Sequence, residues 1–174
     1  EPPAASGRVA VLAVPLAQPE LPQARYALSD NAVVQPSSLS DSDLAHGAVI
    51  TLDADLAGAM VASYNRPVTV RNLRLAIPGM VQPFRSSPVR ALLEARVDGQ
   101  WAKVADLPVT AVVGTHAFAP VTAREFRLRI ERNPDIVQPT EMDGAPGATA
   151  VDIFAISELT SVEVADFRLG ADHR

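Results

Sequence analysis

The feature that most constrains the fold is the pair Asp98-Gly99, which lies between two apolar runs. Val89–Val97 has the pattern of a strand, and residues 100–105 resume that pattern directly after the pair. Asp-Gly between strands is typical of a type I′ turn, because both central residues of that turn need a positive φ. Residues 118–130 then alternate apolar and polar side chains, as a half-buried strand does. These segments predict a β-hairpin followed by a further strand of the same sheet.

Composition and the spacing of the prolines extend this prediction to the whole chain. The 174 residues are enough to bury a two-sheet core, and the 15 prolines separate short apolar runs in a way that would interrupt helices repeatedly. Residues 48–52, 58–64 and 151–159 have strand patterns. In residues 68–77 the inward positions slip once in phase, which predicts a β-bulge. We expect one all-β domain over residues 1–174, an antiparallel β-sandwich with frayed ends at 1–7 and 170–174.

Charge and composition exclude several classes of function. The formal net charge of −5 gives no basic field for nucleic acid. The arginines near residues 124–132 alternate with Glu125 and Glu131, so we expect a solvated sheet face there. The chain has no cysteine, which excludes a disulfide scaffold or a thiolate site, and no run long enough to span a bilayer. We therefore expect no nucleic-acid or membrane partner.

Four motifs, in order along residues 37–164, resemble the galactose-binding-like, or discoidin-type, β-sandwich, a jelly-roll fold. They are SLSDSD at 38–43, NRPVTVRNLRL at 65–75, the Asp-Gly hairpin with FAPVTAREFRL at 118–128, and IFAISELTSV at 153–162. Among such proteins the sequence is most similar to modules of bacterial α-L-rhamnosidases of glycoside hydrolase family 106. In those enzymes the catalytic carboxylates lie in a separate barrel domain. The resemblance therefore implies a non-catalytic accessory module of a bacterial glycoside hydrolase, in the periplasm or outside the cell.

The start of the chain agrees with that origin. Residues 1–8 lack the charged and apolar regions of a signal peptide. We expect the chain to be excised from a larger multidomain protein.

The resemblance also implies a structural Ca²⁺ ion where the early acidic loop meets the closing strand. Asp41 and Asp43 match the loop, and Glu158 matches the acidic residue of the strand. Calcium is held by about six to eight hard oxygens, which carboxylates and loop carbonyls supply. The alternative is that Asp41 and Asp43 are turn residues that bond their own backbone.

Carbohydrate binding is the main functional hypothesis, because loops can place an aromatic ring and planar polar groups against a sugar. Phe84 is the best loop aromatic, with Arg85 beside it, and Asn133 and Asp135 are hydroxyl partners in a second long loop. The remaining aromatics that fall in strand patterns are expected in the core: Tyr64, Trp101, Phe118, Phe126 and Phe154. This shortage of loop aromatics favours the alternative, a structural domain that packs against or completes a catalytic domain without binding sugar.

Catalysis by this chain alone has little support. His46, His116 and His173 are isolated, and neither a GxSxG elbow nor an HExxH zinc pattern is present. Asp53 and Asp55 sit in a turn, where carboxylates are usually solvated. We expect no catalytic residues.

Overall fold

The computed structural model describes residues 21–29, 32–40, 44–78, 87–109, 112–135 and 159–171. Within these residues the regular structure is strand, apart from one short 3₁₀ helix, η1 (Pro36–Leu39). The strands are β1 (Arg25–Leu28), β2 (Val33–Val34), β3 (Ala48–Thr51), β4 (Gly58–Ala76), β5 (Val89–Val97), β6 (Gln100–Leu107), β7 (Gly114–Arg132), β8 (Ser161–Val164) and β9 (Asp166–Gly170). All their pairings are antiparallel, so the predicted all-β class is confirmed.

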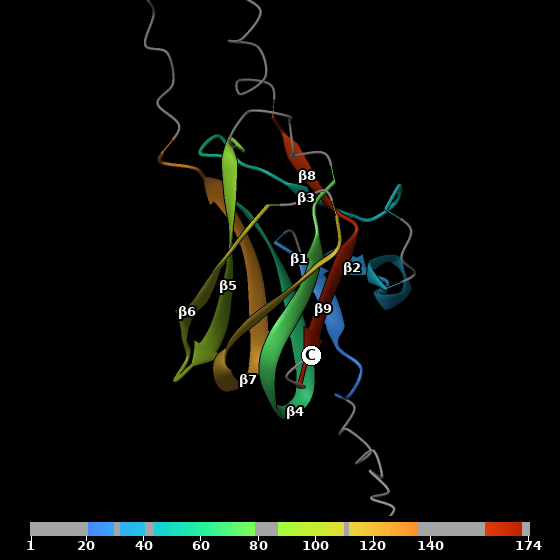
Figure 1. Cartoon of the computed structure of the whole chain (residues 1–174), viewed down its shortest axis with the longest axis vertical. Coiled ribbons are helices and arrows are strands. Elements are labelled where there is room, and N and C mark those ends of the chain that lie inside the picture. The colour runs from blue at the N-terminus through green and yellow to red at the C-terminus, as the bar shows by residue number, and fades with distance from the viewer. Residues whose placement is uncertain are drawn as a thin grey trace, which may run out of the picture.

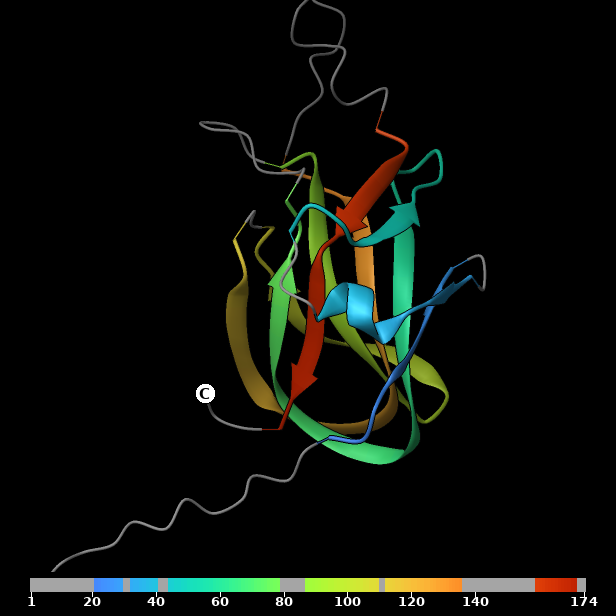
Figure 2. The same ribbon diagram turned by 90° about the vertical axis from the view of Figure 1, so that its right-hand side faces the viewer.

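Two long strands build both layers of the sandwich. β4 and β7 each run for 19 residues, pair with one another and curve together into a U, as Figures 1 and 2 show. One arm of the U belongs to a sheet ordered β2-β1-β4-β7-β5-β6, and β9 pairs with the second arm of β4. A separate ladder of β3 and β8 covers one end of the molecule. The layers are therefore continuous through the bent strands rather than joined only by loops.

The bend in β4 lies between the two strand patterns that the sequence shows at residues 58–64 and 68–77. Asn65, Arg66 and Pro67 are exposed and unpaired with β7, yet they lie inside one continuous strand. The register shifts here, between Ser63 and Val68, and shifts again between Val70 and Asn72. The second shift is the predicted bulge, because it moves the buried positions onto the odd-numbered residues that follow.

The predicted hairpin is confirmed by its backbone. Asp98 and Gly99 have φ values of 50° and 79°, and Val97 pairs directly with Gln100. Both central residues thus adopt the left-handed conformation that a type I′ turn needs.

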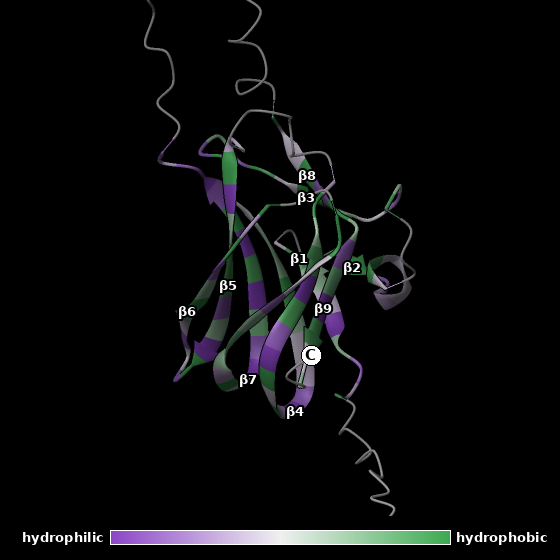
Figure 3. Cartoon of the chain, in the orientation of Figure 1, coloured by the Kyte–Doolittle hydropathy of each residue, from purple (hydrophilic) through white to green (hydrophobic). Residues whose placement is uncertain are grey.

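The core lies between the arms of β4 and β7. Apolar and polar residues alternate as bands along these strands and along β5 in Figure 3, with the apolar set turned inward. Tyr64 and Phe126 pack edge to face with ring centroids 6.2 Å apart, and Phe118 is partly buried against the same cluster. Phe154, another predicted core residue, lies outside the described residues.

Trp101 was expected in the core, and that prediction is wrong. Its side chain is only partly buried, and it lies opposite the exposed Arg96 in the β5–β6 pair. Opposite residues in an antiparallel pair share a face, so Trp101 lies on the outer face of the sheet. The cause is a register shift between Leu93 and Glu94, which reverses the phase of β6 relative to β5.

Candidate functional site

The outer face of β5 and β7 carries a ladder of ion pairs. Glu94 is 6% exposed, and its Oε2 accepts a hydrogen bond of 2.6 Å from Arg127 Nε. The Arg127 guanidinium in turn lies 4.4 Å from the centre of the Trp101 ring. Arg129 contacts both Glu94 and Glu131. These two arginines are thus neutralised by neighbouring carboxylates, as expected for a sheet face rather than a phosphate site.

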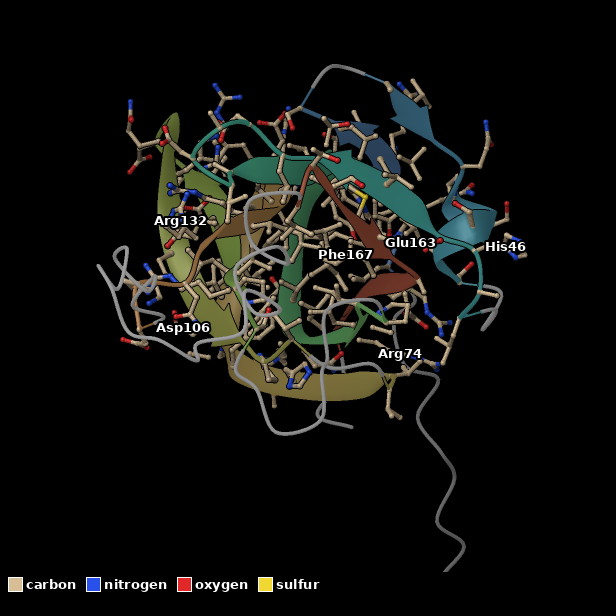
Figure 4. All side chains as sticks on the ribbon, turned by 90° about the horizontal axis from the view of Figure 1, so that it is seen from above. His46, Arg74, Asp106, Arg132, Glu163 and Phe167 are labelled. Atoms are coloured by element: carbon tan, nitrogen blue, oxygen red, sulfur yellow. The ribbon has the colours of Figure 1, made fainter. Side chains whose placement is uncertain are left out.

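The roots of two long loops meet at one end of the sandwich. The Asn133 backbone N–H donates to Pro88 O at 2.9 Å, and its side-chain Nδ2 donates to Ser87 O at 2.9 Å. Asn133 Oδ1 accepts the N–H of Asp135 at 3.1 Å. Asn133 therefore ties the end of β7 to the start of β5. Figure 4 views the molecule from above and shows Arg132, the last residue of β7.

The structure places the predicted carbohydrate residues differently. Asn133 is partly buried and holds the two loop roots together, while Asp135 is exposed beside it. The Asp135 side chain is exposed at the start of the second loop. Phe84 and Arg85 lie outside the described residues. Their loop follows β4 and ends at residues 87–88, which contact Asn133 beside the β5–β7 strand pair.

The predicted calcium ligands Asp41, Asp43 and Glu158 lie outside the described residues. Their flanks can be followed, since Ala48 pairs with Val164 and Thr51 pairs with Ser161. The chains that lead to the acidic loop and to Glu158 thus leave the β3–β8 ladder at opposite ends. Within the described residues, no group of three or more His, Asp or Glu side chains is placed to hold a metal ion. The calcium site stays a prediction.

Asp53 and Asp55 lie in a turn, as the sequence predicted. Asp53 Oδ1 accepts the backbone N–H groups of Asp55 and Ala57, each at 2.9 Å. This carboxylate caps its own turn.

In the part of the chain that the structure describes, no helix is long and apolar enough to cross a membrane.

A buried acid that sequence reasoning did not single out lies on β9. Asp166 is completely buried, and its Oδ2 lies 3.0 Å from Arg74 Nε and 3.1 Å from Arg168 Nη2. Arg74 and Arg168 are paired across β4 and β9, so Asp166 separates two like charges. The available signal was an acid between the apolar residues Ala165 and Phe167, because a buried acid usually needs a charged partner.

Tyr26 lies next to this cluster, and Tyr64 lies near Tyr26. Tyr26 Oη donates to Phe167 O at 3.2 Å, and Phe167 is labelled at the centre of Figure 4. Burial raises the pKa of Tyr26 to about 12, with Arg168 opposing the shift and Asp166 adding to it. Burial also raises the pKa of Tyr64, and the nearby Tyr26 adds to that shift. Both phenols therefore stay protonated at neutral pH.

No family model matches this sequence, and neither does any curated protein. The structure is similar to that of a rhamnosidase from Novosphingobium sp. PP1Y, with a TM-score of 0.64 and 25% sequence identity. The match covers 89% of this chain and 12% of the rhamnosidase, so the chain spans only a small part of that enzyme's length.

Two modules of similar size share the architecture. One is the CBM32 of AlyQ, solved in complex with 4,5-unsaturated mannuronic acid, with a TM-score of 0.51, 12% identity and coverage of 84% of this chain and 94% of that chain. The other is CpGH89CBM32-6 from Clostridium perfringens, with a TM-score of 0.50, 10% identity and coverage of 86% and 94%. At such identities the likeness concerns the fold alone. Together with the topology described above, these matches identify this chain as a β-sandwich of the galactose-binding-like type.

Proposed function

We propose that this chain is a non-catalytic accessory module that binds carbohydrate through the loops at one end of the sandwich. We further propose that its parent is a bacterial glycoside hydrolase of the rhamnosidase type, working in the periplasm or outside the cell. The similarity to the Novosphingobium rhamnosidase over 89% of the chain supports this parentage. The fold shared with the CBM32 modules supports the accessory role.

One observation carries the binding proposal. Asn133 ties the end of one long polar loop to the start of another, so one root of each loop is fixed on the β5–β7 strand pair. Loops placed by a rigid scaffold are common sites of binding. The exposed Asp135 beside this strand pair can accept hydrogen bonds from sugar hydroxyls.

The test is a thermal-shift screen of the chain against rhamnose, galactose and related sugars. A ligand that binds only the folded state raises stability by mass action, by about 2.7 kcal/mol at a concentration one hundred times Kd. We expect a saturable shift with at least one sugar, weakened in D135N. The matched control is D98N, the same chemical change at the far hairpin, where Asn tolerates the positive φ of Asp98. Equal loss in both variants would contradict a loop-end site.

A second function is favoured by the position of the single tryptophan. Trp101 lies on a sheet face, where Arg127 stacks on it. Tryptophan and arginine are enriched in protein interfaces. If no sugar shifts the melting temperature, the better proposal is a structural domain that packs against a catalytic domain through this face.

A further inference from the structure

The single tryptophan of the chain, Trp101, lies on the outer face of the sheet near the β5–β6 hairpin. Figure 1 shows that this hairpin and the bends of β4 and β7 lie at one end of the sandwich, away from the β3–β8 ladder. Arg96, which pairs with Trp101, is seven residues along β5 from Val89 at the loop end. At the rise of a strand this separation is roughly 23 Å. A ligand at Trp101 therefore occupies a different site from one held by the loops.

The indole ring is held by a chain of contacts that starts at a buried acid. Glu94 is buried on this outer face, and its Oε2 accepts the hydrogen bond of 2.6 Å from Arg127 Nε. The Arg127 guanidinium lies over the Trp101 ring, 4.4 Å from its centre. A buried carboxylate costs free energy unless it is well paired, so an acid at this position needs an explanation. Here Glu94 fixes the arginine in the orientation that supports the ring.

The ring remains partly exposed although Arg127 lies over it. The Arg96 guanidinium is farther away, at 5.9 Å from the ring centre, and its Nη1 donates to Glu125 Oε2 at 2.8 Å. A ring whose orientation is already fixed loses little entropy when a ligand stacks on it. The C–H groups of a pyranose carry partial positive charge, and the face of an indole is negative. Trp101 therefore has the features of a platform for a sugar ring.

The charges on this part of the face are balanced, which sets the class of sugar. Each basic side chain is held by an acidic one, and the pairs are Glu94 with Arg127, Glu125 with Arg96 and Asp106 with Lys103. Lys103 lies on the same face as Trp101, two residues along β6, and Lys103 and Asp106 are each more than half exposed. A sugar carboxylate would have to compete with the acids of these pairs, whereas hydroxyl groups can bond to the pairs without separating them. The face therefore favours a neutral sugar.

We propose that Trp101 is the platform of a second carbohydrate site, which binds a neutral pyranose through the apolar face of its ring. Lys103 and Asp106 bond hydroxyl groups at the edge of the stacked sugar. Arg127 is a positioning residue, which keeps the indole in the orientation that stacking needs. The inference rests on the proposed carbohydrate-binding function, and it adds a site and a class of ligand.

The fluorescence of Trp101 reports on this site directly, because the chain has no other tryptophan. The test titrates the protein with galactose, rhamnose and galacturonate and follows emission and thermal shift together. We expect at least one neutral sugar to move the emission saturably to shorter wavelength, because the stacked sugar displaces water from the indole. Galacturonate should bind about tenfold more weakly than galactose. Galacturonate binding as tight as galactose binding would overturn the proposed ligand class.

The two signals separate this site from the loop end. A saturable thermal shift without any change in emission would assign the sugar to the loops and overturn the Trp101 site, while the proposed carbohydrate function would stand. If neither signal changes with any sugar, the carbohydrate function fails as well. W101A, followed by calorimetry and checked for folding by circular dichroism, should bind the neutral sugar about tenfold more weakly. Unchanged affinity in W101A would also overturn the site.

R127K and R129K separate positioning from general stability. Both variants replace an arginine of β7 that contacts Glu94, and of the two it is Arg127 that lies over the ring. Lysine keeps the charge but lacks the planar group that stacks, so R127K should move the emission of the free protein to longer wavelength and weaken binding about fivefold. R129K is the matched control and should leave the emission and the affinity unchanged. Equal effects of the two variants would overturn the positioning role.

Discussion

The two tyrosines of this chain should keep their protons well above pH 10 as long as it is folded. Tyr26 and Tyr64 are the only tyrosines in the sequence and are 7% and 8% exposed. Burial raises the pKa of Tyr26 from 10.0 to about 12 and raises that of Tyr64 in the same direction. The unfolded chain, by contrast, loses both protons near pH 10. Alkaline pH should therefore favour unfolding.

The size of this effect follows from linkage between protonation and folding. Between pH 10 and pH 12 the native state binds the Tyr26 proton and the unfolded state does not, so the free energy of unfolding falls as pH rises. The contribution of Tyr26 to the free energy of unfolding is fully present below pH 10. Raising its pKa from 10.0 to about 12 corresponds to about 2.7 kcal/mol. Tyr64 adds a loss of the same sign. Against a typical total stability of about 5–15 kcal/mol, this loss removes a large part of the free energy of unfolding by pH 12.

The assay is a spectrophotometric titration of tyrosinate alongside the fluorescence of Trp101. We expect no tyrosine ionisation near pH 10 in the folded protein, and ionisation that coincides with the unfolding signal. The same titration in denaturant should show both tyrosines ionising near pH 10. Y26F should remove part of the alkaline loss of stability. A tyrosine that ionises near pH 10 while the fluorescence remains native would refute the reasoning.

Two further stability predictions test the ion-pair and core assignments. D166N should destabilise the fold by about 3–5 kcal/mol, because it leaves the guanidiniums of Arg74 and Arg168 beside each other without the buried carboxylate. The melting temperature should fall by roughly 6–20 °C, at about 2–4 °C per kcal/mol. A melting temperature within a degree of wild type would contradict this role. In denaturant titrations, Trp101→Ala should cost about 1–2 kcal/mol and Phe126→Ala about 3–5 kcal/mol, because Trp101 is on the outer face and Phe126 is fully buried. Equal costs would place Trp101 in the core.

The candidate site could be predicted only in part. The sequence indicated two long polar loops. In the second loop it suggested Asn133 and Asp135 as partners of sugar hydroxyls. That residue pattern did not show that the Asn133 side chain is already used to join the loop roots, because its partners at residues 87–88 are far away in the sequence.

Sequence patterns were enough to predict the backbone features that depend only on neighbouring residues. Asp98-Gly99 sets the hairpin because the two residues tolerate positive φ, and the phase slip after Val70 marks the bulge because side-chain direction alternates along a strand. Features that depend on contacts between distant segments were determined only by the tertiary structure. The bend at residues 65–67 joins two layers only because β1 and β9 pair with different arms of β4. The outward position of Trp101 follows from a register shift in its pairing with β5, and Asp166 is buried because β4 and β9 bring two arginines to it.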